Sequence, residues 1–271
     1  MAQQASPEME QYFKDINEEV LQIYEIAKAA KSSGFDPDDD VTVPLAKNMA
    51  ERVEGLISTV APEILNTGVV KRIEELEVQY GSQNWRVALK IAEEVAKEQF
   101  CKFDTKKKAI EVGIRIGFAY VTVGVVSSPL EGFVEVKFNK RKDNGKEYFC
   151  LMYSGPIRSA GGTGASVSAL IADYVRKKLG YAQYDATENE IKRAYVELAD
   201  YHERVTNLQY FPSEDEVEFM MKHLPIQING DASEKFEVSK YKDLDRIESN
   251  KIRNGFCLMI GECLCAKAPK L

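Results

Sequence analysis

The sequence has few of the residues from which catalytic and metal sites are usually built. Its 271 residues include only two histidines and one tryptophan. His202 lies in the string Tyr-His-Glu-Arg, which lacks the second histidine of a zinc-protease helix. The serines of residues 154–166 have no nucleophile elbow around them. We therefore predict no catalytic residues and no metal site in this chain, and we expect His202 to be buried or to cap a helix.

Long hydrophobic runs and regularly spaced cysteines are also missing. The most apolar run, residues 116–126, is too short to span a bilayer. Residues 6–8, Ser-Pro-Glu, do not resemble the start of a signal peptide. Five cysteines without regular spacing indicate reduced thiols. Cys263 and Cys265 are separated by one residue, unlike a zinc knuckle pair, so we expect them to be buried. The sequence thus predicts a cytoplasmic protein without membrane contact.

Positive charge is scarce overall, but it is concentrated in one segment. The chain carries 36 Lys and Arg against 43 Asp and Glu, a net charge of −7. Residues 101–180 carry 14 basic against 7 acidic side chains, whereas residues 1–80 carry 7 against 16 and residues 181–271 carry 12 against 17. A basic segment in an acidic protein is typical of a nucleic-acid footprint. The alternative is that these lysines only solvate a hairpin.

Apolar periodicity predicts an α+β fold. Hydrophobic residues make up 44% of the chain and charged residues 29%, as in globular proteins. Ser6 and Pro7 begin a helix in which apolar residues recur every three or four positions from Met9 to Ala27. This stripe needs a partner surface, either the core of the chain itself or another subunit, so self-association is one option.

The remaining elements follow from the same reasoning. Helical stripes cover residues 69–80, 87–95 and 105–120, and Gly113 and Gly117 permit close helix packing. Alternating residues 133–138 and 147–153 around Asp143-Asn-Gly145 predict a β-hairpin. We expect a helix from Ala165 that buries Val167, Leu170, Ile171 and Tyr174. Capping boxes at Thr187 and Ser213 each predict the start of a further helix. Strands are expected at Ile226–Ile228, Phe236–Ser239 and Phe256–Ile260.

Three regions result from this assignment. Residues 1–40 are predicted to form an amphipathic helix and an acidic linker, and residues 41–125 a helical region. Residues 126–271 are predicted to form an α+β region with a small antiparallel sheet, packed with helices, and a glycine-rich loop.

That glycine-rich loop is the most informative stretch of the chain. Residues 153–164 read Tyr-Ser-Gly-Pro-Ile-Arg-Ser-Ala-Gly-Gly-Thr-Gly and run into the predicted helix. A helix N-terminus presents unpaired N–H groups and a positive dipole end, which suits phosphate. Arg158 adds a fork-shaped donor. Because the loop fits neither the P-loop nor the dinucleotide fingerprint, we predict neither nucleotide hydrolysis nor hydride transfer.

The string from Gly155 to Thr163 resembles the signature of the large subunit of archaeal D-family DNA polymerase, also called DNA polymerase II. Further matches in the same order lie at residues 127–132, 201–206, 208–213 and 225–230. The resemblance covers roughly the whole chain. The family's large subunit is several times longer, however, and its catalytic carboxylates lie beyond Leu271. The chain is therefore identified as the N-terminal region, whether a cloned fragment, a partial gene product or a split subunit.

The resemblance implies template-directed DNA synthesis with magnesium, in a heterodimer whose small subunit is a 3′–5′ exonuclease. Magnesium is expected for the complete polymerase, and no cofactor is expected in this chain. We predict that the region helps to assemble the large subunit and holds the backbone of a primer–template. The expected phosphate contacts are Arg158, Ser159, Gly161, Gly162 and Thr163, with Lys106, Lys107, Lys108, Lys140, Arg141 and Lys142 adding sequence-independent attraction.

Two other functional classes stay open. In the first, the glycine-rich loop packs one domain against another, Arg158 pairs with a carboxylate, and the chain is an assembly module that does not touch DNA. In the second, the loop binds a small phosphorylated ligand in a stand-alone enzyme.

Overall fold

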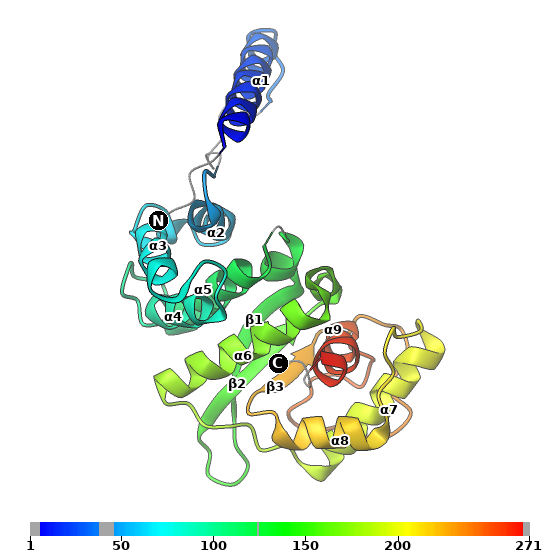
Figure 1. Cartoon of the computed structure of the whole chain (residues 1–271). Coiled ribbons are helices and arrows are strands. Elements are labelled where there is room, and N and C mark those ends of the chain that lie inside the picture. The colour runs from blue at the N-terminus through cyan, green and yellow to red at the C-terminus, as the bar shows by residue number, and fades with distance from the viewer. Residues whose placement is uncertain (1–5, 38–45, 124, 268–271) are drawn as a thin grey trace. The chain divides into compact units, whose positions relative to one another are not determined.

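The computed structural model describes residues 6–37, 46–123 and 125–267, and the chain forms two compact units, Met1–Lys47 and Asn48–Leu271. The first unit contains α1 (Pro7–Ser32), which Ser6 caps by accepting the Met9 N–H (Figure 1). The predicted helix is confirmed. Most of its apolar residues stay exposed, and Ala27 alone is buried among the described residues of α1. Its partner surface stays a prediction, and linker residues 38–40 lie outside the described ranges.

The second unit begins with helices. Thr105 caps the last of them by accepting the Lys108 N–H, as predicted, and Gly81 ends another at a φ of 94°. The three predicted helical stripes are confirmed as helices. The elements are α2 (Met49–Ser58), a 3₁₀ turn (Pro62–Ile64), α3 (Val69–Tyr80), α4 (Trp85–Ala96) and α5 (Lys106–Val121).

Helices α4 and α5 pack backbone against backbone. A Cβ atom on Gly113 would lie 2.5 Å from the Ala92 carbonyl oxygen, and one on Gly117 would lie 2.8 Å from that of Ala88. Only glycine allows an approach this close, so the predicted role of the two glycines is confirmed.

Glu93 ties α4 to a later helix, α6 (Gly161–Leu179). Its carboxylate accepts hydrogen bonds from the Tyr174 hydroxyl at 2.8 Å and from Lys97 Nζ at 2.7 Å. Burial raises the pKa of Glu93, but the hydrogen bonds from Lys97 and Tyr174 outweigh it, and the pKa falls to about 2. The ionised carboxylate is therefore the form that stabilises this contact.

We expect the Glu93→Gln variant to lose on the order of 2 kcal/mol of unfolding free energy at neutral pH, after allowance for solvent screening. Because the folded-state pKa lies below the unfolded value, the contribution is complete above about pH 4.5 and declines as the pH falls toward 2. Urea unfolding of the wild type and the variant at pH 7 and pH 3 measures the difference. A difference that does not change with pH would contradict this assignment.

A three-stranded sheet follows, in the order β1 (Phe133–Lys140), β2 (Glu147–Tyr153), β3 (Gln227–Gly230). The predicted hairpin is confirmed, because β1 and β2 pair antiparallel with Phe138 opposite Phe149. The prediction of an antiparallel sheet is wrong for β3, which runs parallel to β2. The chain passes through α6, α7 (Glu188–Arg204) and α8 (Glu214–His223) between the two strands, and such a crossover returns a strand in the same direction.

β2 is the centre of the core. Residues 148–153 are all buried, so both faces of this strand are covered. Helix α6 crosses one face of the sheet in Figure 1, and Tyr153 reaches it through a 2.9 Å hydrogen bond with Ser168. Both predicted capping boxes are confirmed, with Thr187 opening α7 and Ser213 opening α8. The α+β class is therefore confirmed.

Two predicted strands at the C-terminal end are wrong. Residues 256–260 belong to α9 (Asn254–Cys257) and to a buried π-helix, Leu258–Cys265. Residues 236–239 form no strand and contribute one isolated bridge, from Glu237 to Lys251. The first run is apolar on every side, and periodicity alone does not separate a buried helix from a buried strand.

The start of α6 and its buried face also differ from prediction. The helix begins at Gly161 rather than Ala165, after a 3₁₀ turn at Gly155–Ala160. Ile171 is buried as expected, but Leu170 is 51% exposed, and Val167 and Tyr174 are only half-buried. The buried face consists instead mainly of small residues: Ala165, Ser166, Ser168, Ala169 and Ala172.

Candidate nucleic-acid interface

The glycine-rich turn is packed against the π-helix Ser128–Gly132. A Cβ atom on Gly132 would lie 2.5 Å from the backbone nitrogen of Ile157. Ser128 Oγ donates to the Pro156 carbonyl at 2.9 Å. The Ser159 hydroxyl lies within hydrogen-bonding distance of two others, 2.6 Å from Ser128 Oγ and 2.7 Å from Ser127 Oγ. The hydroxyl of Ser159, a predicted phosphate contact, is thus already hydrogen-bonded within the turn.

The next three predicted contacts open α6. Gly161 has a φ of 69°, a left-handed conformation that favours glycine. A Cβ atom on Gly162 would lie 2.7 Å from the carbonyl oxygen of Glu262, so this glycine lets the π-helix Leu258–Cys265 approach. Thr163 is exposed. Close packing is therefore enough to explain why residue 162 is glycine, and the left-handed backbone conformation explains why residue 161 is.

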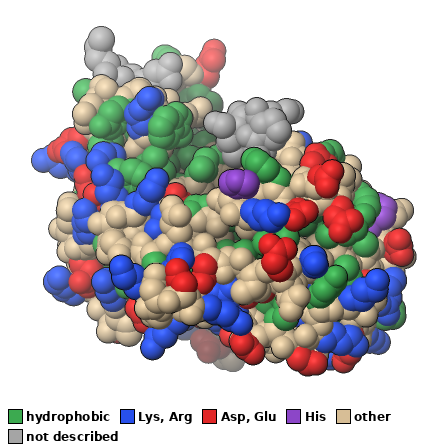
Figure 2. Space-filling model, turned by 90° about the horizontal axis from the view of Figure 1, so that it is seen from below, with side chains coloured by type: hydrophobic (Ala, Val, Ile, Leu, Met, Phe, Trp, Pro, Cys, Tyr) green, Lys and Arg blue, Asp and Glu red, His purple; other side chains and the backbone are tan. Residues whose placement is uncertain are grey.

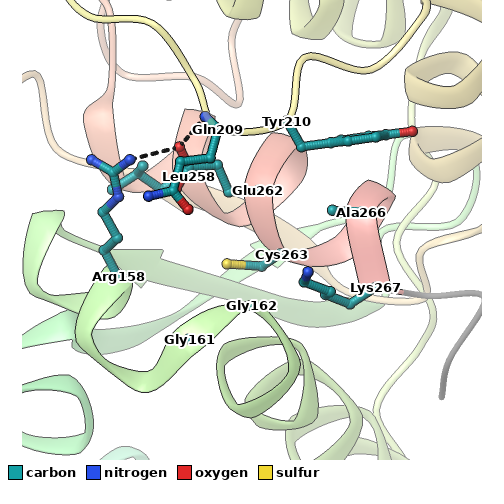
Figure 3. A pocket seen from close by; sticks show the side chains of 10 residues that line it. All are labelled: Arg158, Gly161, Gly162, Gln209, Tyr210, Leu258, Glu262, Cys263, Ala266 and Lys267. Carbon is teal, nitrogen blue, oxygen red and sulfur yellow. Dashed lines mark hydrogen bonds and ion pairs between the residues drawn. The ribbon is translucent and has the colours of Figure 1, made fainter.

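Arg158 pairs with a carboxylate 104 residues later in the chain. Its Nη2 lies 3.0 Å from Glu262 Oε1, and the same oxygen accepts the Gln209 N–H at 2.8 Å (Figure 3). The Glu262 side chain is 8% exposed, whereas that of Arg158 is 43% exposed. This is the ion pair that the assembly-module alternative requires.

A cavity of about 300 Å³ separates the turn from the π-helix. Figure 3 shows Arg158 and Lys267 approaching it from different walls, with Cys263 between them. The complete lining is Arg158, Gly161, Gly162, Gln209, Tyr210, Leu258, Glu262, Cys263, Ala266 and Lys267.

Four of the six other predicted basic contacts are engaged within the protein. Lys107 pairs with Glu135, and Lys108 Nζ donates to the Val60 carbonyl at 2.7 Å. Two more lie on the hairpin turn, where Arg141 bonds Asp143 and Lys142 Nζ lies 3.1 Å from Asp245. Lys106 and Lys140 are exposed, and no carboxylate of the described residues forms a salt bridge with either.

The structure places these lysines far from the glycine-rich turn. A Cβ atom on Gly164 would lie 3.1 Å from Thr122 Cγ2, which puts the turn at the C-terminal end of α5. Lys106 begins α5. At 1.5 Å per residue, the 16 residues of this helix separate the two places by about 24 Å. The predicted contacts therefore form two groups rather than one site.

Exposed lysines of α5, β1 and α6 that form no salt bridge with a described carboxylate lie near a group of aromatic rings, with Lys106 at Tyr181 and Lys178 Nζ 5.2 Å from the Tyr174 ring. Lys106 Nζ lies 5.1 Å from the Tyr181 ring, which stacks on Phe138 of β1 at 5.2 Å. Lys140 follows Phe138 by two residues on the same side of β1, opposite Glu147 in the register. The last turn of α6 adds two exposed lysines just before Tyr181. We call these residues the lysine cluster: Lys106, Lys140, Lys177 and Lys178.

Ion pairs with acidic residues elsewhere in the chain neutralise much of the positive charge that the sequence concentrates in residues 101–180. Lys137 of the basic segment pairs with Glu248 at 2.7 Å, as Lys142 does with Asp245 and Arg158 with Glu262. Figure 2 accordingly shows basic and acidic side chains mixed over the visible face. The basic segment does not form one continuous positive surface on that face.

Sequence reasoning missed three cationic residues at the two places. Lys177 and Lys178 lie in the last turn of α6, where basic side chains also compensate the helix dipole. Lys267 was not considered, because it lies more than 100 residues beyond Arg158. The basic run at 176–178 was the available signal for the first two, and no local pattern pointed to Lys267.

The C-terminal cysteines are buried, as predicted, whereas His202 is only half-buried and bonds a loop rather than capping a helix. His202 Nδ1 accepts the Leu208 N–H at 2.9 Å, and its ring stacks on Phe211. Burial raises the pKa of Cys263 and Cys265 to about 12, so both thiols stay protonated. Within residues 6–37, 46–123 and 125–267, no group of three or more His, Cys, Asp or Glu could hold a metal ion. None of the helices described there combines the length and apolarity needed to cross a bilayer.

Comparison with known proteins adds an independent line of information. The sequence model of the family described as DNA polymerase II large subunit DP2, N-terminal, matches residues 11–271. The chain is 47% identical over 260 residues to the DNA polymerase II large subunit of Nanoarchaeum equitans, covering 96% of the chain and 21% of the relative. The corresponding proteins of Methanosarcina barkeri and Pyrococcus furiosus are each 42% identical to it, over 98% and 97% of the chain and 22% and 20% of their own lengths. The chain thus spans about a fifth of these curated relatives.

Proposed function

This chain belongs to the family formed by the N-terminal region of the DNA polymerase II large subunit, and on that basis we propose that it is an accessory region which binds the DNA backbone and helps to assemble the subunit. The resemblance of its sequence to this family, inferred from the glycine-rich turn, is confirmed. Its relatives are named as DNA polymerase subunits, which supports a role in DNA synthesis.

We assign template-directed synthesis with magnesium to the complete polymerase, with its catalytic residues in the remainder of the large subunit. Within the described ranges, no group of three or more His, Cys, Asp or Glu side chains could hold a magnesium ion. We derive no metal-dependent step from them. The remainder of the large subunit, an exonuclease small subunit and a primer–template are the proposed partners, and the cytoplasm is the proposed location.

The lysine cluster supports backbone binding more directly than the glycine-rich turn does. Its ammonium groups form no salt bridge to a carboxylate of the described residues, and Lys106, Lys140, Lys177 and Lys178 are exposed. Exposed ammonium groups without a salt bridge attract phosphate without reading bases, which is what a sequence-independent polymerase needs. In contrast, Arg158 of the turn would have to share its donors with Glu262.

We expect the chain to bind a fluorescent primer–template with a steep salt dependence. A triple variant, Lys106→Ala with Lys177→Ala and Lys178→Ala, should reduce the slope of log K against log salt by about one unit for each lysine that contacts a phosphate. Fluorescence anisotropy across a salt series measures this slope.

The matched control removes three lysines that are paired with carboxylates, namely Lys102, Lys222 and Lys242. It changes the net charge by the same amount and should leave the slope nearly unchanged. Equal losses in the two triple variants would mean that only net charge matters, and binding that is insensitive to salt would exclude backbone contact.

The Arg158–Glu262 pair favours a second candidate function, an assembly module without DNA contact. Capture of the remaining large subunit or of the small subunit by the immobilised chain, unaffected by competitor DNA, would support it. If the chain also fails to bind primer–template at low salt, this candidate replaces the first.

A further inference from the structure

The cavity between the glycine-rich turn and the π-helix Leu258–Cys265 holds more positive than negative charge (Figure 3). We infer that this cavity binds a single phosphate group between Arg158 and Lys267, at a site separate from the lysine cluster. The inference goes beyond the proposed function and does not depend on it, because the two sites lie at opposite ends of α5.

The two cations reach the cavity from different elements. Arg158 lies on the 3₁₀ turn before α6, and Lys267 follows the π-helix. The stem of Lys267 passes over Gly162, since a Cβ atom there would lie 2.7 Å from Lys267 Cε. Gly162 thus makes room for the lysine whose head group lines the cavity. No salt bridge joins Lys267 to a carboxylate in the described part of the chain.

Cys263 provides a second indication that both cations face one space. Its sulfur lies between them in Figure 3. Burial and the negative charge of Glu262 raise the pKa of its thiol, and the positive charges of Lys267 and Arg158 act in the opposite direction. Arg158, Cys263 and Lys267 all line the same cavity.

Glu262 is the only carboxylate among the described residues that lines the cavity, and it is held in place. One of its oxygens already accepts Arg158 Nη2 and the Gln209 N–H. A guanidinium has five donors, and Glu262 receives one of them from Arg158. The other donors of Arg158 remain for an oxyanion. Glu262 therefore orients Arg158. With two cations and one anion, the lining of the cavity keeps a net charge of +1.

The lining indicates phosphate rather than a larger or apolar ligand. A volume of about 300 Å³ is at the small end of ligand sites. Guanidinium and ammonium groups match phosphate oxygens, and Gly161 and Gly162, at the start of α6, also line the cavity. The phosphate could belong to the end of a nucleic acid or to a free phosphate compound, and both sources present the same oxygens.

The test is titration of the 271-residue chain with inorganic phosphate by calorimetry, against sodium chloride of equal ionic strength. We expect Arg158→Gln and Lys267→Gln each to weaken binding roughly tenfold. Glu262→Gln should strengthen it, because a negative charge leaves the cavity while an acceptor oxygen remains. Lys102→Gln, which removes an exposed lysine paired with Glu98 outside both sites, is the control and should bind phosphate as the wild type does.

Binding to phosphate that is no tighter than to chloride would overturn the inference, and so would equal losses in Lys102→Gln and Lys267→Gln. Melting temperatures near the wild-type value show that the variants are folded. A variant that loses phosphate binding in the cavity should keep the salt dependence of DNA binding by the lysine cluster. The two proposals can therefore be contradicted independently of each other.

A second arm identifies the source of the phosphate. A short oligonucleotide with a 5′-phosphate is compared with the same oligonucleotide without it, in the wild type and in Lys267→Gln. A gain from the 5′-phosphate that Lys267→Gln abolishes assigns the site to nucleic-acid ends. Binding of inorganic phosphate without such a gain assigns it to free phosphate compounds.

Discussion

Replacing Glu197 by alanine is expected to lower the free energy of unfolding by about 3–5 kcal/mol. The side chain is fully buried on α7 and lies between two buried arginines. Arg253 Nη2 lies 2.6 Å from Glu197 Oε2, and Arg193 Nε lies 3.2 Å from the same oxygen. Removing the carboxylate would leave two buried guanidinium groups without their counter-charge.

Urea unfolding at pH 7 measures this loss. The control is Glu203→Ala, which removes an exposed carboxylate from the same helix and should change stability by no more than about 0.5 kcal/mol. Adding Arg253→Met to Glu197→Ala should recover part of the loss, because one unpaired charge is then gone. If Glu197→Ala unfolds like the control, the buried network does not stabilise the fold.

This network also positions the cavity. Arg253 bonds Asn229 of β3 at 2.6 Å and directly precedes α9, which continues into the π-helix that carries Glu262. We therefore expect Glu197→Ala, at temperatures where it stays folded, to weaken phosphate binding as well. A stable variant with unchanged phosphate affinity would separate the network from the site.

Replacing Arg115 by methionine is expected to cost about 3 kcal/mol or more. Arg115 is 8% exposed on α5, and its Nη1 lies 2.6 Å from the carbonyl oxygens of both Pro129 and Phe133 and 3.0 Å from that of Leu130. Methionine fills a similar volume but donates no hydrogen bond, so these carbonyls would be left unpaired.

Chemical unfolding of Arg115→Met, Arg115→Lys and the exposed control Arg86→Met measures the effect. Lysine keeps the charge but cannot reach several carbonyls in one plane, so Arg115→Lys should recover only part of the stability. The control should lie within about 0.5 kcal/mol of the wild type. Full recovery by lysine would show that charge, and not the fork of donors, holds the segment.

Short-range features of the fold could be predicted well from the sequence. The caps at Ser6 and Thr105 and the capping boxes at Thr187 and Ser213 act within three residues, so a local pattern contains all the partners. The hairpin turn at 143–145 is equally local. In contrast, the apolar run at 256–260 was assigned to a strand, because local pattern does not show how completely a segment is buried.

The candidate site was only half predictable. Arg158 and the glycines were found because they are neighbours in sequence, but their interpretation as an open phosphate loop left out Glu262. Lys106 and Lys140 belong to the basic segment, whereas the structure adds Lys177 and Lys178, because Tyr181, two residues after α6, stacks on Phe138 and contacts Lys106.

By itself, the sequence determined the family, the helix caps and the hairpin, because each depends on residues a few positions apart or on a continuous motif. Only the tertiary structure showed that glycine is needed at positions 113 and 117, which pack on α4, and which positive charges are free. Lys137, Lys142 and Arg158 pair with carboxylates more than 100 residues away, while Lys106 and Lys177 form no salt bridge within the described part of the chain. Coulomb energy depends on distance in space, and chain order does not reveal that distance.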